Sequence, residues 1–301
     1  MVIDVRHAPT TPHHLTEPAR RQVFRSLDRK QKMSQTMMAP MSASSGNPAL
    51  SDGFVQTQLT SAGAGARTMS VAGISIKTLI FLVFVVAGGS WGWASATNEV
   101  PPELGTGYAD TTVTIPGGFW LASLGAFFLA IMITVAPGRA AVLGVLYALA
   151  EGFVLGAISA AFDAQTEGIV GAAVLSTLCV FLVALFLYMT RIVQPTQKLA
   201  FAVIAGMGGL MLLYFIVFVM SIFNWSWLYS DSFRTIGLVI TIVSVALAAL
   251  SLVLDFGAIE MGVEAGAPKA LEWYMAFSLM VTLIWLYITL LKLIALLTRN
   301  R

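Results

Sequence analysis

Residues 199–223 read LAFAVIAGMGGLMLLYFIVFVMSIF, a run without a single charged side chain. A helix rises about 1.5 Å per residue, so about 20 apolar residues cross a hydrocarbon core about 30 Å thick. Lipid offers no hydrogen-bond partners, so a spanning segment must satisfy its own backbone groups, and a helix does this. The run therefore predicts a transmembrane helix.

The same pattern repeats along the chain, and the runs are continuous rather than alternating, which favours helices over the strands of a barrel. The predicted spans are Thr78–Ala96, Gly117–Ala136, Ala140–Ala161, Gly168–Met189, Leu199–Phe223, Thr235–Ala258 and Leu271–Leu297. Of the 301 residues, 57% are hydrophobic and only 11% are charged, whereas a soluble protein has about a quarter charged residues. We expect an all-α, polytopic membrane protein with a seven-helix domain over residues 72–301 and the lipid bilayer as its partner.

Residues 1–71 have a different composition, rich in Ser, Thr, Gln, Gly, Pro and Met without a sustained apolar period. Such segments bury too little apolar surface to fold alone, so a disordered polar and basic tail is expected. It lacks the apolar core and cleavage site of a signal peptide. The basic cluster Arg20–Lys32 is open to two interpretations, a solvated tail or a segment that touches anionic headgroups.

The distribution of Lys and Arg predicts the orientation. The tail is basic, the connection Asn98–Pro116 has no Lys or Arg, and the next connection carries Arg139. Positive and non-positive connections alternate almost throughout, with Arg234 beside Asp231 in a later outer connection. Arg299 and Arg301 do not fit, because they would end on the outer side. We expect a cytoplasmic N-terminus. The net charge of +2 is too small to indicate a nucleic-acid partner.

Three ionisable residues, Glu151, Asp255 and Lys292, lie within the predicted spans. Such a residue costs at least about 2.5 kcal/mol at the centre of a span and is a functional candidate by default. Glu151 lies near the middle of its span, on a helix with a small residue at every fourth position, of which Gly152 and Gly156 form the usual motif for close helix contact. Its role is either in a proton or ion pathway or in a hydrogen bond between helices.

Polar residues form a stripe on each of the last two spans. Asp255 is expected near the inner end of the sixth span, and Thr241, Ser244 and Ser251 share its face; the seventh span carries Ser278, Thr282, Trp285, Thr289 and Lys292 in steps of three and four. The candidate pathway residues are Asp255, Glu151, Ser251 and Thr289. Stripes of Ser and Thr also join helices without any pathway. Lys292 is expected at the opposite end from Asp255, with its ammonium reaching the outer headgroups.

The sequence excludes several enzyme classes. No His follows His14, and neither His-Glu-x-x-His nor a phosphate-binding glycine loop occurs, so a serine–histidine protease, a zinc protease of that type and an ATP-driven pump are excluded. The single Cys179 cannot form an intrachain disulfide. We expect no enzyme activity, no cofactor and no metal centre.

Three stretches resemble one family of membrane proteins. Residues 146–159 read LYALAEGFVLGAIS, residues 168–177 read GIVGAAVLST, and residues 252–297 include LVLDFGAIEMGVEAGAPKALEWYMAF and VTLIWLYITLLKL. They resemble the Bax inhibitor-1 family, including its bacterial YccA-like members. This resemblance implies seven helices with the last one central, and a plasma (inner) membrane location. Ser45–Ser51 looks like the natural start of bacterial relatives, so translation is expected to begin near Met41.

Members of this family are described as pH-sensitive calcium leak channels and as regulators of cell death or membrane stress. The resemblance implies a pH sensor made of two aspartates, one on each of the last two helices, and Asp255 matches the first. The second is missing, because Leu286, Tyr287, Ile288 and Thr289 stand where relatives carry a carboxylate.

Glu151, Glu260 and Glu272 are the carboxylates that could substitute for the missing aspartate. We expect a passive cation channel, a calcium leak with a carboxylate-dependent response to pH. The alternative is a non-conducting regulator of stress or quality control that binds other membrane proteins.

Overall fold

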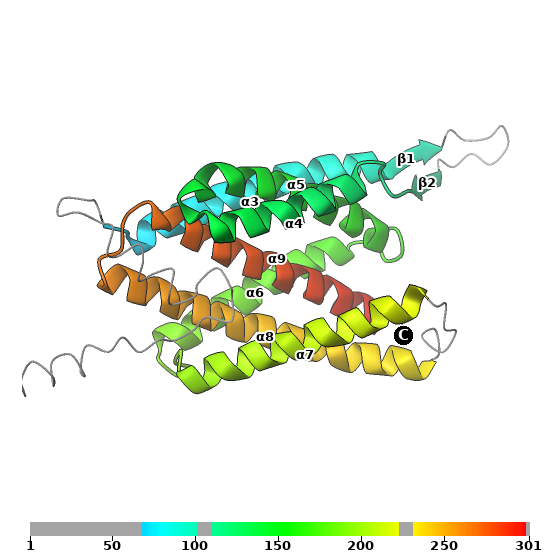
Figure 1. Cartoon of the computed structure of the whole chain (residues 1–301). Coiled ribbons are helices and arrows are strands. Elements are labelled where there is room, and N and C mark those ends of the chain that lie inside the picture. The colour runs from blue at the N-terminus through cyan, green and yellow to red at the C-terminus, as the bar shows by residue number, and fades with distance from the viewer. Residues whose placement is uncertain (1–67, 101–109, 223–230, 299–301) are drawn as a thin grey trace, which may run out of the picture. The chain divides into compact units, whose positions relative to one another are not determined.

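A computed structural model describes residues 68–100, 110–222 and 231–298, which belong to one compact unit. Seven α-helices run alongside one another in these ranges (Figure 1). They are α3 (Val71–Ala96), α4 (Phe119–Val135), α5 (Ala140–Asp163), α6 (Ile169–Met189), α7 (Gln197–Ile222), α8 (Asp231–Glu264) and α9 (Leu271–Thr298). A 3-10 turn, η2 (Pro137–Arg139), leads into α5.

Six of these helices are long and apolar enough to cross a membrane. The other, α4, has 17 residues, which is the shortest length that spans a bilayer, where about 17–25 residues are typical. The predicted all-α, polytopic membrane architecture is therefore confirmed. The tail at residues 1–67, the basic cluster and the expected start near Met41 lie outside the described residues.

Two helices extend well beyond the apolar runs that predicted them. Helix α3 begins at Val71 instead of Thr78, and the Ser70 hydroxyl caps it by accepting a hydrogen bond from the Gly73 backbone N–H at 3.1 Å. Helix α8 continues past Ala258 to Glu264. The predicted spans end where charged residues begin, because they were defined by hydropathy. The helices are longer because their backbone hydrogen bonds continue past those charged residues.

Short β elements accompany the helices. Strands β1 (Thr97–Val100) and β2 (Asp110–Val113) pair antiparallel, with Thr97 opposite Val113, in the connection between α3 and α4. Just before α3, Thr68 forms an antiparallel bridge with Pro268, and the Met69 N–H donates to the Ala267 carbonyl at 2.8 Å. The chain that enters α3 is thus tied to the connection between α8 and α9.

Helices α3 and α5 pack through glycines, as the small-residue pattern predicts. A Cβ atom at Gly156 would lie 1.9 Å from the Gly89 carbonyl oxygen, and one at Gly92 would lie 2.0 Å from that of Phe153. Only glycine allows two backbones to approach so closely. The predicted close-contact motif is therefore confirmed, with α3 as its partner.

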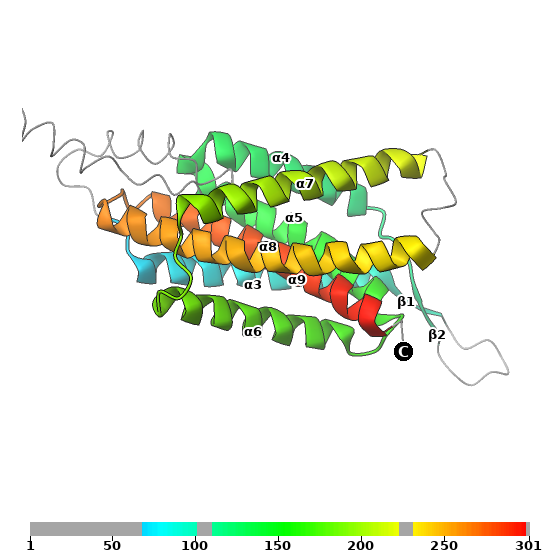
Figure 2. The ribbon, with the colours of Figure 1, turned by 90° about the horizontal axis from the view of Figure 1, so that it is seen from below.

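Helix α9 packs against α3, α5, α6 and α8 (Figure 2). Most of its side chains between Leu271 and Leu291 are buried. The central position among seven helices that the resemblance implies stays a prediction.

Candidate functional site

The buried carboxylate of Asp255 joins α8 to α9. Its side chain is 1% exposed. The Thr282 hydroxyl donates to Oδ2 at 2.6 Å, and the Ser278 hydroxyl lies 3.4 Å from Oδ1, at the long limit of a hydrogen bond. The polar stripe of the last span therefore faces the predicted carboxylate of the span before it.

This site lies deeper in the helix pair than the sequence suggested. The predicted span Thr235–Ala258 placed Asp255 within a turn of its end. However, α8 continues to Glu264, which lies about 14 Å beyond Asp255 along the helix axis. On α9, Thr282 lies about 17 Å from the helix start at Leu271. Asp255 is therefore away from the ends of both helices, and the predicted position near the end was wrong.

Ser251 lies one turn before Asp255 on α8 and is buried. Its hydroxyl has no hydrogen-bond partner among the described residues. Thr241 and Ser244 on the same stripe instead donate to the carbonyls of Gly237 and Ile240, four residues earlier, at 2.7 and 2.8 Å, as helical hydroxyls usually do. Ser251 thus differs from Thr241 and Ser244, because its buried hydroxyl, one helical turn before Asp255, has no hydrogen-bond partner among the described residues.

Thr289 takes no part in this cluster. Its hydroxyl is buried and is bonded within α9, at 2.9 Å from both the Trp285 and the Leu286 carbonyl oxygens. It lies about two turns, or about 10 Å, past Thr282. Its predicted role in a pathway with Asp255 stays a prediction.

Glu151 on α5 is half-buried, and the structure records no hydrogen bond from its carboxylate to another described residue. Tyr147, one turn earlier, packs edge-on against Phe277 of α9, with ring centroids 5.1 Å apart. The face of α5 next to Glu151 therefore packs on α9, but the structure does not show Glu151 bonded to Asp255.

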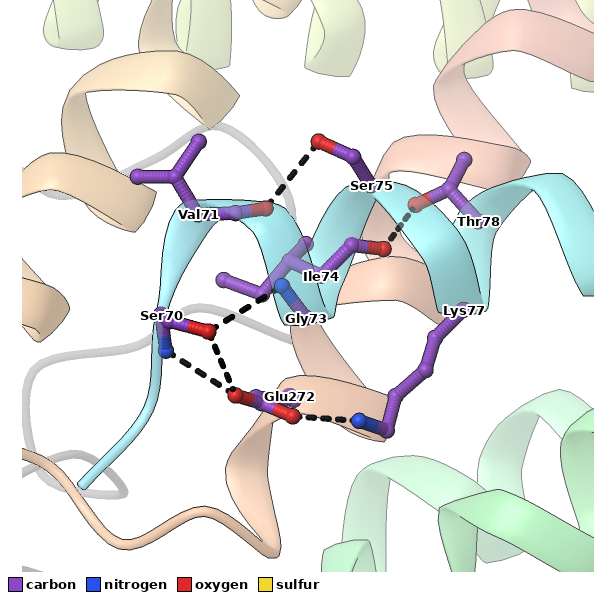
Figure 3. Close-up of polar contacts among 8 residues, drawn as sticks. All are labelled: Ser70, Val71, Gly73, Ile74, Ser75, Lys77, Thr78 and Glu272. Carbon is purple, nitrogen blue, oxygen red and sulfur yellow. Dashed lines mark hydrogen bonds and ion pairs between the residues drawn. The ribbon is translucent and has the colours of Figure 1, made fainter.

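A second buried carboxylate, Glu272 in the first turn of α9, forms a network with α3 (Figure 3). Its side chain is 0% exposed and pairs with the Lys77 ammonium. The Ser70 backbone N–H and hydroxyl donate to Oε1 at 2.9 and 3.2 Å. The ammonium also lies 5.2 Å from the centre of the Trp273 ring, a cation–π contact. Among the described residues, the donors to this carboxylate thus come from α3 and its cap.

Sequence reasoning missed this network. From the sequence, Glu272 is a candidate only as a substitute for the missing aspartate, and Lys77 is not singled out at all. The largely apolar residues 71–76 before Lys77 were the available signal. They place Lys77 nearly two turns inside an apolar helix, where a Lys needs a partner or a route to water. Gly73 leaves room for this carboxylate, since a Cβ atom there would lie 2.4 Å from Glu272 Oε1.

Three further charged side chains, Glu260, Arg191 and Lys292, also have partners. Glu260 accepts a hydrogen bond from the Tyr188 hydroxyl and lies 3.7 Å from the Arg191 guanidinium. The Lys292 ammonium lies 5.4 Å from the centre of the Tyr214 ring on α7. In the described ranges no group of three or more His, Cys, Asp or Glu side chains is placed to hold a metal ion.

Two of the carboxylates that could substitute for the missing aspartate, Glu260 and Glu272, are thus bonded to other groups. Around Asp255 the structure gathers hydroxyls, from Ser278 and Thr282 on α9 and from Ser251 one turn away on α8. Chemically, this cluster holds one proton-accepting group and several oxygen atoms that can donate or accept hydrogen bonds.

Comparison of the chain with curated proteins and with solved structures gives no match. The model of the family described as Bax inhibitor 1 like matches residues 22–299, which includes every described helix and the cluster around Asp255. The sequence resemblance and this match agree, so the chain is a multi-pass membrane protein that belongs to the Bax inhibitor 1 like family.

Proposed function

We propose that this protein conducts cations passively across the membrane, calcium among them, along a path between α8 and α9 that Asp255 controls. One observation carries the proposal: a buried carboxylate lies away from the ends of both helices and is met by hydroxyls of the facing helix. An ionisable side chain at such a place is expensive, and in membrane proteins it marks ion and proton pathways.

The hydrogen bonds of Asp255 suggest how pH acts on the path. An ionised carboxylate accepts hydrogen bonds only, whereas a protonated one must also donate. The Thr282 hydroxyl has a second acceptor within reach, the Ser278 carbonyl of its own helix at 3.3 Å. Protonation of Asp255 would let this hydroxyl turn to its own helix, which removes a bond between α8 and α9. Acid would thus loosen the helix pair at the level of Asp255.

The oxygen atoms around Asp255 suit weak, transient binding of a permeating cation better than a tight calcium site. Calcium takes six to eight oxygen ligands in proteins, and its tight sites use several carboxylates. Here one carboxylate is accompanied by the uncommitted hydroxyl of Ser251 and by Ser278 and Thr282. A path must bind an ion weakly enough to release it, so a single carboxylate is compatible with a leak.

One observation favours a second function, a non-conducting regulator that binds other membrane proteins. Both oxygens of Asp255 already face donors from α9, and polar groups join transmembrane helices in this way without any transport role. In this case Asp255 would fasten two helices, and the activity would lie in contacts with partners. Neither function requires catalysis, and we propose that the protein is not an enzyme.

Ion flux distinguishes the two functions. Purified protein would be placed in liposomes that contain a calcium indicator, and influx would be followed from about pH 5 to about pH 8. This range lies above the ordinary carboxyl pKa of about 4 and extends to the values of about 8 documented for buried carboxyl groups. The same vesicles with sodium or potassium would test selectivity. Asp255→Asn would be compared with Glu167→Gln, an exposed acid in the connection between α5 and α6.

We expect the wild type and Glu167→Gln to leak calcium in a pH-dependent way and Asp255→Asn to lose that dependence. Absence of flux at every pH would contradict the conduction proposal and favour the regulator. For location, we propose the plasma membrane, as the family resemblance implies. For orientation, we propose a cytoplasmic N-terminus, which the basic residues before α3 and the alternation of positive connections support.

A further inference from the structure

A cavity of about 720 Å³ runs along one side of the helix bundle between α3 and α6. Its walls come from these two helices, and its floor is formed by residues of α5 and α9 that lie behind them. On α3 the lining extends from Ser75 to Trp93, which is about 27 Å along the helix axis. We refer to this feature as the α3–α6 groove.

The rim of the α3–α6 groove is exposed and its floor is buried. Leu79 and Val86 on α3 are 62% and 67% exposed, and Leu178 on α6 is 53% exposed. On the floor, Leu155 of α5 and Ile284 of α9 are buried. The groove is therefore open toward the apolar outer face of two candidate membrane spans.

The packing of the neighbouring helices explains the groove. Gly156 on α5 and Gly89 on α3 bring the backbones of these helices into direct contact, while α6 packs against α8 and α9. Helix α3 is thus held against α5 and α6 against α9, so the two walls stand apart. Protein interiors are normally close-packed, so an open groove of this size calls for an occupant.

The polar groups of the lining identify the chemistry of that occupant. The hydroxyls of Ser75, Thr78, Ser90 and Thr177 donate to carbonyls of their own helices, and those of Ser159 and Tyr287 bond each other at 2.7 Å. Every hydroxyl in the lining is therefore already satisfied. A bound water needs two to four polar partners, and a charged headgroup needs more, so neither finds a site here.

We propose that the α3–α6 groove binds the hydrocarbon chain of a bilayer lipid. Its length of about 27 Å is close to the thickness of a hydrocarbon core, about 30 Å, and acyl chains are the apolar material that surrounds the exposed rim. The bound chain fills the space between α3 and α6 and contacts the floor residues of α9. This inference does not depend on the proposed conduction.

A photoactivatable lipid tests the proposal directly. The protein would be placed in nanodiscs of phosphatidylcholine that carries a diazirine near the end of one acyl chain. After irradiation, mass spectrometry would locate the adducts. We expect adducts on floor residues such as Leu155 and Ile284, which lipids at the outer surface do not reach. Adducts confined to exposed residues outside the lining, such as Val83 and Leu182, would overturn the proposal.

A matched pair of variants on α6 gives the control. Leu178 lines the groove and Leu182 does not, although both are exposed leucines one turn apart. Leu178→Trp should fill the groove and abolish labelling of the floor, whereas Leu182→Trp should leave it unchanged. Unchanged floor labelling in Leu178→Trp would overturn the proposal.

A second pair on α3 keeps the test valid if a variant on α6 fails to fold. Leu79 lines the groove and Val83 does not, and both are exposed. Leu79→Trp should reduce floor labelling and Val83→Trp should not. Equal floor labelling in these two variants would again overturn the proposal.

Discussion

Lys77 on α3 and Glu272 on α9 form a buried ion pair, although they lie 195 residues apart in the sequence. The Glu272 carboxylate receives further hydrogen bonds from Ser70, the residue that caps α3. A buried charge is tolerated when it is paired and its remaining lone pairs are satisfied. The beginning of α3 is therefore anchored to the beginning of α9, and the Met69–Ala267 backbone bond reinforces the same junction.

We expect Glu272→Gln to destabilise the protein by about 3 kcal/mol, because removing one partner leaves the other charge buried and unpaired. Thermal unfolding in detergent would measure the change. The double variant Lys77→Met/Glu272→Gln should lose less than Glu272→Gln alone, since it has no orphaned charge. Lys198→Met, which removes an exposed charge, is the control and should change stability little.

If Glu272→Gln and Lys198→Met unfold at the same temperature, the ion pair contributes nothing measurable and the anchoring role is wrong. If the double variant loses more than Glu272→Gln alone, Lys77 stabilises the fold by another contact. The cation–π contact with Trp273 is one such contact.

The ion pair between Lys77 and Glu272 needs a glycine at position 73, because a side chain there would occupy the space of the carboxylate. A Cβ atom at this position would lie 2.4 Å from Glu272 Oε1, so Gly73→Ala should push the carboxylate away from Ser70 and Lys77. Overpacking of this kind costs about 1–3 kcal/mol, and thermal unfolding would measure it. The control is Gly171→Ala on α6, where a Cβ atom meets nothing within 4 Å. Because Ala has a higher helix propensity than Gly, Gly171→Ala should not destabilise the protein. Equal unfolding temperatures of the two variants would contradict the proposed role of Gly73.

The close contact between α3 and α5 should tolerate an added side-chain atom even less than Gly73 does. At Gly156 an added Cβ atom would lie 1.9 Å from the Gly89 carbonyl oxygen, and a backbone atom cannot turn aside as a side chain can. We expect Gly156→Ala to cost about 3 kcal/mol by forcing the helices apart. Gly125→Ala on α4, with open space around the new atom, should cost nothing. Equal unfolding temperatures would contradict the close contact.

The sequence predicted those features that a single helix displays by itself. The glycine period on the third span indicated a close contact, and the structure supplies its partner, α3. The polar stripe with Ser278 and Thr282 predicted a polar face on the last span, and in the structure this face contacts Asp255. In both cases the spacing along one helix carried the information.

Features that depend on two helices meeting could not be predicted. Nothing in the sequence places Lys77 next to Glu272, because the pair depends on how the first and last spans pack. The depth of Asp255 was misjudged for a different reason. The apolar run ends before Glu260, but α8 continues to Glu264, since a helix tolerates charged residues that a hydropathy window rejects.

Thr282 and Thr289 provide a matched test of the Asp255 cluster. Both are buried on α9, but Thr282 donates to Asp255 at 2.6 Å, whereas Thr289 is bonded only to carbonyls of its own helix among the described residues. A hydrogen bond to a charged group contributes about 1.5–3 kcal/mol. Thr282→Val should therefore destabilise the protein more than Thr289→Val and should alter calcium flux in liposomes.

Equal effects of the two valine variants on unfolding and flux would show that the Thr282–Asp255 bond has no special role. Normal calcium flux in a destabilised Thr282→Val protein would show that the bond contributes to stability but not to conduction. The bond would then fasten α8 to α9 without controlling a path, as the regulator function requires.

The proposed orientation predicts which connections a membrane-impermeant reagent reaches. Because consecutive spans alternate in direction, the connection between α5 and α6 lies outside if the N-terminus is cytoplasmic, and the connection before α7 lies inside. Gln165 and Lys198 are exposed residues in or beside these connections. In a Cys179→Ser background, Gln165→Cys should react with an impermeant maleimide on intact cells. Lys198→Cys should react only after the membrane is permeabilised, and the reversed pattern would invert the whole topology.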